Sequence, residues 1–210
     1  MEDILDLYHE PYDQNRPIIC FDESSKALRG HKRDPLPAEP GAVARIDTHY
    51  ERNGKKKIHL ATEPLTGWVT VAVTDQRRAC EWIDQMVELA DDHYPDADCI
   101  RVVMDHLNTH NPANFYQFLP PDEAQDYLDR FEFHFVPKHG SWLNMAEIEL
   151  GVLKRQCLNR RIYHAATLRS EVAAWQADRN ATKRLIDWQF TTNDARIKLR
   201  RLYPVPIAEN

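Results

Sequence analysis

Two aspartates follow short apolar segments that have the character of buried strands. Asp22 comes directly after the run Arg16 to Phe21, and Asp105 directly after the run Ile100 to Met104. Ligands of open α/β sheets gather at the carboxyl ends of strands, so neighbouring strands would bring the two carboxylates together. Adjacent negative charges are costly unless a cation neutralises them, and ligands that are all oxygen favour Mg²⁺ or Mn²⁺. Each aspartate alone is more simply a turn or cap residue, but the pair indicates a metal site.

A third acid has to come from the helical part of the chain, where Glu147 and Glu149 compete. Two residues apart on a helix corresponds to about 200° of rotation, so both cannot face one site. Asn144 precedes Glu147 by three residues, a spacing that also suits a helix-capping box. Gly151 would leave the Glu147 face open, and Lys154 would add a positive charge to it. Spacing alone leaves Glu147 balanced between a catalytic role and a capping role.

The first half of the chain predicts a group of antiparallel strands, which would form the sheet that positions Asp22 and Asp105. Three prolines make residues 28–41 a loop, and we expect strands over 44–51 and 57–62 around a hairpin turn at Asn53-Gly54. A further strand is expected over 68–73, after a turn at Gly67. Thr74 would then cap a helix with apolar positions at Ala79, Trp82, Ile83, Met86 and Ala90. Such a crossover helix makes the 100–104 strand parallel to the first.

The second half of the chain predicts short helices, one more strand and then helices only. We expect helical pieces over 114–119 and 123–128 and a strand over 131–136. Further helices are expected from Leu143, with residues 143, 146, 150, 153 and 157 on one face, from Thr167, with residues 168, 172 and 175 inward, and from Thr192. In that last helix, we expect residues 195, 199 and 202 to face inward and Arg196, Lys198 and Arg200 outward. The predicted fold class is α/β, a mixed sheet flanked by helices.

The length and composition are typical of a single domain that folds without disulfides or structural zinc. The 210 residues include four cysteines with no CxxC pair, which suits a reducing, cytoplasmic setting rather than a disulfide scaffold or zinc ribbon. We found no apolar run of membrane-spanning length and no signal peptide. His106 and His110 have a spacing that can hold zinc on a helix, but no third nitrogen or sulfur ligand lies near them.

Charge is distributed unevenly along the chain. Residues 1–137 carry 14 Lys and Arg against 26 Asp and Glu, whereas residues 138–210 carry 13 against 7. A moderate basic excess alone is more typical of a solvated helical face than of a nucleic-acid surface, so it needs an independent signal.

Three segments supply that signal. Ile19–Glu23, Val103–His110 and His134–Glu147 resemble the catalytic blocks of bacterial transposases of the insertion sequence 630 type, in the mariner superfamily. Tyr50–Gly54 and Thr191–Leu199 extend the resemblance, which runs from about residue 1 to residue 204. The domain division expected from it is a linker over 1–15, a DDE catalytic domain over 16–204 and a tail over 205–210.

The resemblance implies an RNase H-like fold in which Asp22, Asp105 and Glu147 bind two divalent ions, Mg²⁺ or Mn²⁺, and cut and join DNA at transposon ends. Its partners would be transposon-end and target DNA and a homodimer or synaptic complex, with no membrane. Lys138, His139, Lys154, Arg155 and Arg161 are the candidate DNA contacts; loop or surface solvation is the competing interpretation.

Two departures from the family pattern qualify the expected function. His106 stands where the family commonly has asparagine, and the helix-turn-helix modules that read terminal repeats are not encoded before Asp22. The chain therefore resembles a catalytic half, either one frame of a split element with a separately encoded helix-turn-helix protein, or a truncated remnant. The alternative function is a catalytically silent protein that pairs with a full-length transposase and inhibits it. A nuclease acting on RNA–DNA hybrids fits less well, because the 143–147 block resembles transposases.

Overall fold

The computed structural model describes residues 1–203, in which the chain forms a mixed sheet enclosed by helices. The strands are β1 (Ile18–His31), β2 (Tyr50–Glu63), β3 (Trp68–Thr74), β4 (Ile100–Met104) and β5 (Phe131–Phe135). The helices are α1 (Glu2–Leu7), α2 (Ala79–Glu88), α3 (Phe115–Phe118), α4 (Pro121–Arg130), α5 (Ala146–Leu153), α6 (Ala165–Thr182) and α7 (Thr192–Lys198). A π-helical turn extends α2 over Leu89–His93 and another extends α5 over Lys154–Leu158.

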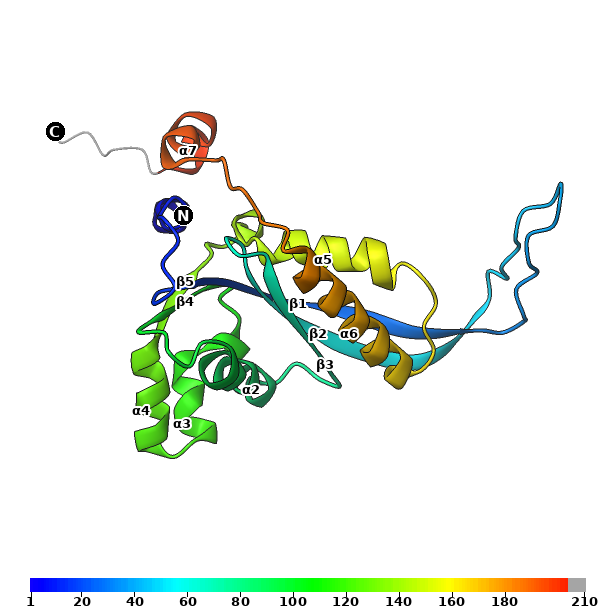
Figure 1. The fold of residues 1–210 in the computed structure, drawn as a ribbon, viewed down its shortest axis with the longest axis horizontal. Coiled ribbons are helices and arrows are strands. Elements are labelled where there is room, and N and C mark those ends of the chain that lie inside the picture. Colours follow the sequence, from blue (N-terminus) through cyan, green and yellow to red (C-terminus); the bar gives the residue numbers. More distant parts are fainter. Residues whose placement is uncertain (204–210) are drawn as a thin grey trace.

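The sheet has the strand order β3-β2-β1-β4-β5, with antiparallel pairing among β1 to β3 and parallel pairing from β1 to β4 and from β4 to β5. Helices α5 and α6 cover one face and α2 to α4 the other (Figure 1). Each face has its own apolar core: Cys20, Leu60 and Leu153 belong to the first, and Phe21, Trp82 and Phe115 to the second. The alternation of Cys20 and Phe21 between cores is the two-residue period of a strand buried on both faces. The predicted mixed α/β sheet is therefore confirmed.

Strand β1 is longer than the run that predicts it. It continues through Asp22 to His31, because residues beyond Phe21 still pair with β2, from Cys20 opposite Thr62 to His31 opposite Tyr50. Asp22 therefore lies inside a strand and not at its end. The parallel pairing with β4 nevertheless covers only Ile18 to Cys20, so Asp22 lies where β1 runs past the end of β4.

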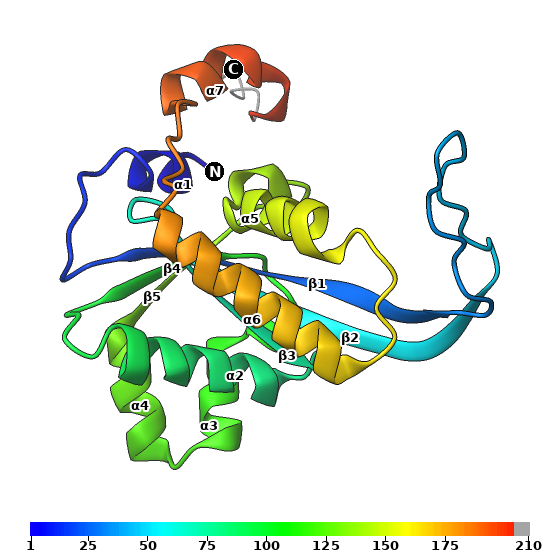
Figure 2. The same cartoon turned by 45° about the vertical axis from the view of Figure 1, so that its right-hand side comes forward.

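The prediction of a hairpin turn at Asn53-Gly54 is wrong. Both residues lie within β2, and together they oppose the single residue Leu28 as a β-bulge, between the pairs Ala27–Lys55 and Arg29–Arg52. Gly54 has φ +84°, the left-handed conformation that a glycine adopts without a steric penalty. The same dipeptide that favours a two-residue turn thus serves a bulge here, and the connection between β1 and β2 is residues 32–49, which project from the body of the fold (Figure 2).

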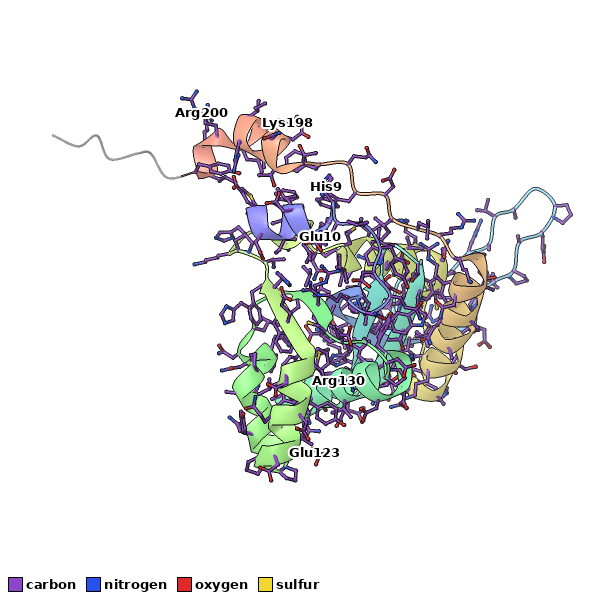
Figure 3. All side chains as sticks on the ribbon, turned by 60° about the vertical axis from the view of Figure 1, so that its left-hand side comes forward. His9, Glu10, Glu123, Arg130, Lys198 and Arg200 are labelled. Carbon is purple, nitrogen blue, oxygen red and sulfur yellow. The ribbon has the colours of Figure 1, made fainter. Side chains whose placement is uncertain are left out.

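Smaller differences concern element ends. Thr74 closes β3, and α2 begins only at Ala79, where Arg78 and Glu81 form the capping box. In the predicted last helix Ala195 is buried, but Leu202 is exposed because the helix ends at Lys198. Lys198 and Arg200 point outward, as expected (Figure 3).

The first residues are not a linker. Ile4, Leu5 and Leu7 of α1 are buried in the α5 and α6 core, and Arg196 of α7 pairs with Glu2. This packing places α1 against α7 (Figure 3). The tail expected over 205–210 lies outside the described residues.

Within residues 1–203, no helix combines the length and apolar character needed to cross a membrane.

Candidate active site

Asp22 and Asp105 lie on adjacent strands at the edge where β4 stops. Asp22 follows the last residues of β1 that pair with β4, and Asp105 is the first residue after β4. The side chain of Asp22 is partly buried, and its Oδ1 accepts a hydrogen bond from the backbone N–H of Glu23 at 2.7 Å. The side chain of Asp105 is about one third exposed. Both carboxylates are thus partly accessible to solvent.

Asn144 brings the start of α5 to this edge. Its Nδ2 donates to the backbone oxygen of Phe21 at 2.8 Å, directly beside Asp22, and its Oδ1 accepts from the N–H of Ala146 at 3.1 Å. Asn144 therefore fastens the helix to β1, and it does not form the capping box with Glu147 that the spacing left open. The Glu147 side chain is exposed in the first turn of α5.

The surroundings of Asp22 disfavour its charged form. Burial, together with the negative charges of Asp105, Glu147 and Glu23, raises the pKa of Asp22 to about 7, against the opposing effect of the Glu23 N–H. An aspartate with such a pKa is poorly accommodated as an anion without a neutralising cation. Asp105 and Glu147, which lie far from Asp22 in the sequence, thus act on Asp22 in the folded chain.

Glu149 faces away from this cluster. It is buried between α5 and α6, where its Oε2 accepts a hydrogen bond from Nε of Arg179 at 2.8 Å. The opposite helical phases of Glu147 and Glu149 follow from their two-residue separation.

Sequence reasoning missed the residues behind Asp105. His110 is fully buried, with Nδ1 2.7 Å from Oδ1 of Asp105 and Nε2 2.7 Å from Oε1 of Glu23. Burial lowers the pKa of His110, but the two carboxylates outweigh this effect and raise it to about 9. His106 instead stacks on Phe135, with ring centroids 4.5 Å apart, so the two histidines do not share one site. The one available signal was that Glu23, next to Asp22 in a strand, must point to the opposite face.

A groove of about 550 Å³ lies between β1 and the end of α5. Ser24 and Lys26 line its floor, two and four residues beyond Asp22 on the same side of β1, and Lys154 lines its wall. The other basic residues that line it are Arg29, Arg160 and Arg161. The groove is therefore basic and begins next to the acidic cluster.

The five residues expected to contact DNA differ in their surroundings. Lys138 and His139 are exposed in the turn after β5, and His139 has φ +64°. Lys154 and Arg155 are exposed and form no ion pair within residues 1–203. Arg161 instead donates to the backbone oxygens of Asp47 and His49, at 2.6 and 3.2 Å, which holds the base of the projecting loop. Lys26, which sequence reasoning did not select, donates to the backbone oxygen of Arg160 at 2.6 Å.

The acidic cluster suits a hard divalent cation. Its accessible donors are carboxylate oxygens, and the charge accumulated around Asp22 is what such a cation would neutralise. Among the described residues, the one group of His, Cys, Asp and Glu whose donor atoms all lie within 4.8 Å of one another is Glu23, Asp105 and His110, which includes Asp105 but neither Asp22 nor Glu147.

The sequence profile of the DDE superfamily endonucleases matches residues 17–169, and the chain therefore belongs to this family of endonucleases. No curated protein sequence matches the chain.

Solved structures of Mos1 have the same RNase H-like fold. The Mos1 strand transfer complex matches with a TM-score of 0.56 and 14% identity, over 84% of this chain and 51% of the Mos1 chain. The Mos1 mariner paired-end complex with Mn matches with a TM-score of 0.52 and 17% identity, over 84% of this chain and 52% of the other. A further Mos1 paired-end complex, with Mg, is similar as well. The chain thus spans about half the length of these relatives, and at this identity the likeness concerns the fold.

Proposed function

We propose that this chain is the catalytic region of a mariner-type transposase, which cleaves DNA at transposon ends and joins the ends to target DNA with divalent metal ions. The observation that carries this proposal is that the negative charges of Asp105 and Glu147 help to raise the pKa of Asp22 to about 7. Membership of the DDE endonuclease family and the Mos1-like fold support it.

Asp22, Asp105 and Glu147 would hold two Mg²⁺ or Mn²⁺ ions. Bound ions of this kind activate an attacking water or 3′-hydroxyl and stabilise the leaving oxygen of an in-line displacement. The chain's own contribution is rigidity: Asp22 is held within a paired strand, and Asn144 fastens the Glu147 helix to that strand. Such a geometry needs no covalent protein intermediate.

The basic groove would receive the DNA backbone next to the acids. Lys154, Arg155, Lys138 and His139 are the exposed candidates, and their contacts would be with phosphates, which fix position without reading sequence. Arg161 would act mainly by holding the projecting loop, because its guanidinium is already engaged by backbone oxygens.

The partners that this function requires are transposon-end and target DNA. We infer a homodimer or a larger synaptic complex, and a helix-turn-helix region, encoded separately or in the same protein, that recognises the ends. The Mos1 structures are complexes with transposon ends, which supports this inference. The four free cysteines agree with action in the cytoplasm.

The test is metal-dependent cleavage of duplex DNA carrying the terminal repeats that flank the coding gene. Glu147→Gln should abolish cleavage, and Glu149→Gln is the matched control two residues away, expected to retain it in protein that remains folded. Equal loss of cleavage in two folded variants would contradict the assignment of Glu147. Metal binding without any cleavage by the wild-type chain would favour the alternative, a silent protein that inhibits a full-length transposase.

A further inference from the structure

His110 lies between two carboxylates that belong to different strands of the sheet. Its Nδ1 is 2.7 Å from Oδ1 of Asp105 and 3.1 Å from the backbone oxygen of the same residue. Its Nε2 is 2.7 Å from Oε1 of Glu23. On one side the imidazole is hydrogen-bonded to the main chain of Asp105 and within ion-pair distance of its carboxylate, and on the other side it is hydrogen-bonded to Glu23.

Glu23 is a firm anchor for this contact. Its side chain is 3% exposed, and it lies on the face of β1 opposite to Asp22. Nδ1 of His59 and Nη1 of Arg77 approach the same carboxylate at 3.7 and 4.0 Å. An acid this deeply buried persists only where polar groups compensate for its lost hydration, and here three basic side chains surround it.

Aromatic rings fix the plane of the imidazole. The ring centroid of His110 is 5.6 Å from that of Phe21 and 5.8 Å from that of Trp82, and all three side chains are buried. The position of the imidazole is therefore set by packing as well as by its polar contacts, and a ring fixed in this way transmits its position to the group it touches.

Burying His110 and Glu23 together is not an efficient way to stabilise the fold. A buried polar pair is often no more stable than well-packed apolar residues of similar volume. What it supplies is orientation: a carboxylate held through one oxygen presents the other in one direction, and partners of this kind commonly orient metal ligands.

We propose that His110, anchored by Glu23, is a positioning residue that orients the Asp105 carboxylate toward the divalent cation. The inference rests on the proposed function, in which Asp105 is a metal ligand. His110 and Glu23 lie on the α2 side of the sheet, behind Asp105, and would fix the direction of its carboxylate, which the three acids alone cannot do.

A pair of conservative variants separates the two contacts of His110. In His110→Asn the amide nitrogen is placed near the position of Nδ1 and keeps a donor for Asp105, whereas in His110→Gln it reaches toward Glu23 instead. Mn²⁺ affinity, measured by calorimetry on the full chain without DNA, is the readout, and urea unfolding in EDTA shows whether each variant is folded. His134→Phe is the matched control, because His134 is also buried against two carboxylates, but those of Asp3 and Glu132.

We expect His110→Gln to weaken the affinity for Mn²⁺ about 10- to 100-fold, the usual effect of removing such a partner. His110→Asn keeps the donor for Asp105, so its affinity for Mn²⁺ should stay within about threefold of the wild-type value. His134→Phe should leave the affinity unchanged. Equal affinities of the Asn and Gln variants would overturn the positioning role. Mn²⁺ binding that survives Asp22→Asn and Glu147→Gln but not His110→Gln would also overturn it, because His110 would then be a ligand. Binding that survives Asp105→Asn would instead refute the metal site itself, and with it the proposed function.

Discussion

Replacing Asp22 by Asn should stabilise the metal-free protein at neutral and alkaline pH. The pKa of Asp22 rises from its ordinary value of 3.8 to about 7 on folding, first through burial and then through the charges of Asp105, Glu147 and Glu23. Between these two values the folded state binds more protons than the unfolded state, so stability falls as pH rises through this range. Asparagine keeps the size and the acceptor oxygen for the Glu23 N–H but carries no charge to be penalised.

The size of the effect follows from the same pKa. At about 1.36 kcal/mol for each tenfold change in proton affinity, an increase from 3.8 to about 7 corresponds to a ceiling of about 4 kcal/mol. Because Asp22 is partly exposed, solvent screens the charge, and we expect about 1 to 2 kcal/mol at pH 8.5 and little at pH 4. For a domain of this size, 1 to 2 kcal/mol corresponds to an increase in Tm of about 2 to 8 °C.

The assay is urea unfolding of wild-type protein and Asp22→Asn at pH 4, 6 and 8.5 in EDTA. Asp194→Asn is a control of opposite sign, since hydrogen bonds with Lys198 and Thr191 lower the pKa of Asp194 to about 2, and its replacement should reduce stability as pH rises. Mg²⁺ at about ten times its Kd should add about 1.4 kcal/mol to the wild type and less to Asp22→Asn. If Asp22→Asn were no more stable than wild type at pH 8.5 in EDTA, the electrostatic account of the site would be refuted.

Three further predictions concern the surroundings of the site. Glu149→Gln should reduce the unfolding free energy in urea melts by about 3 kcal/mol, because it leaves Arg179 buried without its charge partner. Glu147→Gln should not reduce the unfolding free energy, and equal stabilities of the two variants would show that the buried pair contributes nothing. Lys154→Ala should reduce the slope of log DNA affinity against log salt by about 0.9, and Arg161→Ala should instead speed proteolysis within residues 32–49; an unchanged slope for Lys154→Ala would assign Lys154 to a solvated face. The chain should bind terminal repeats and scrambled duplex within about tenfold of each other in a competition titration at fixed salt, since its proposed contacts are with phosphates; a larger preference for the repeats would show that this chain reads sequence itself.

The sequence alone was sufficient to predict the elements that depend on local pattern. The apolar runs before Asp22 and Asp105 predict two buried strands, and the 3.6-residue period predicts the buried faces of α2 and α5, because side-chain direction within one element follows from its own geometry. The opposite orientations of Glu147 and Glu149 follow in the same way. The family resemblance selected the three acids of the candidate site, whose shared role as metal ligands stays a prediction.

Long-range pairing decided what local pattern could not. Asn53-Gly54 suits a turn and a bulge equally, and only the register of β2 against β1 selects the bulge. The first residues form part of the core because α1 meets α7, an association across nearly the whole chain. His110 and Glu23 look like unremarkable polar residues in the sequence. Their contact exists because β1 and β4 pair in parallel and expose them to the same core, and such a meeting of distant side chains depends on tertiary packing, which no local pattern records.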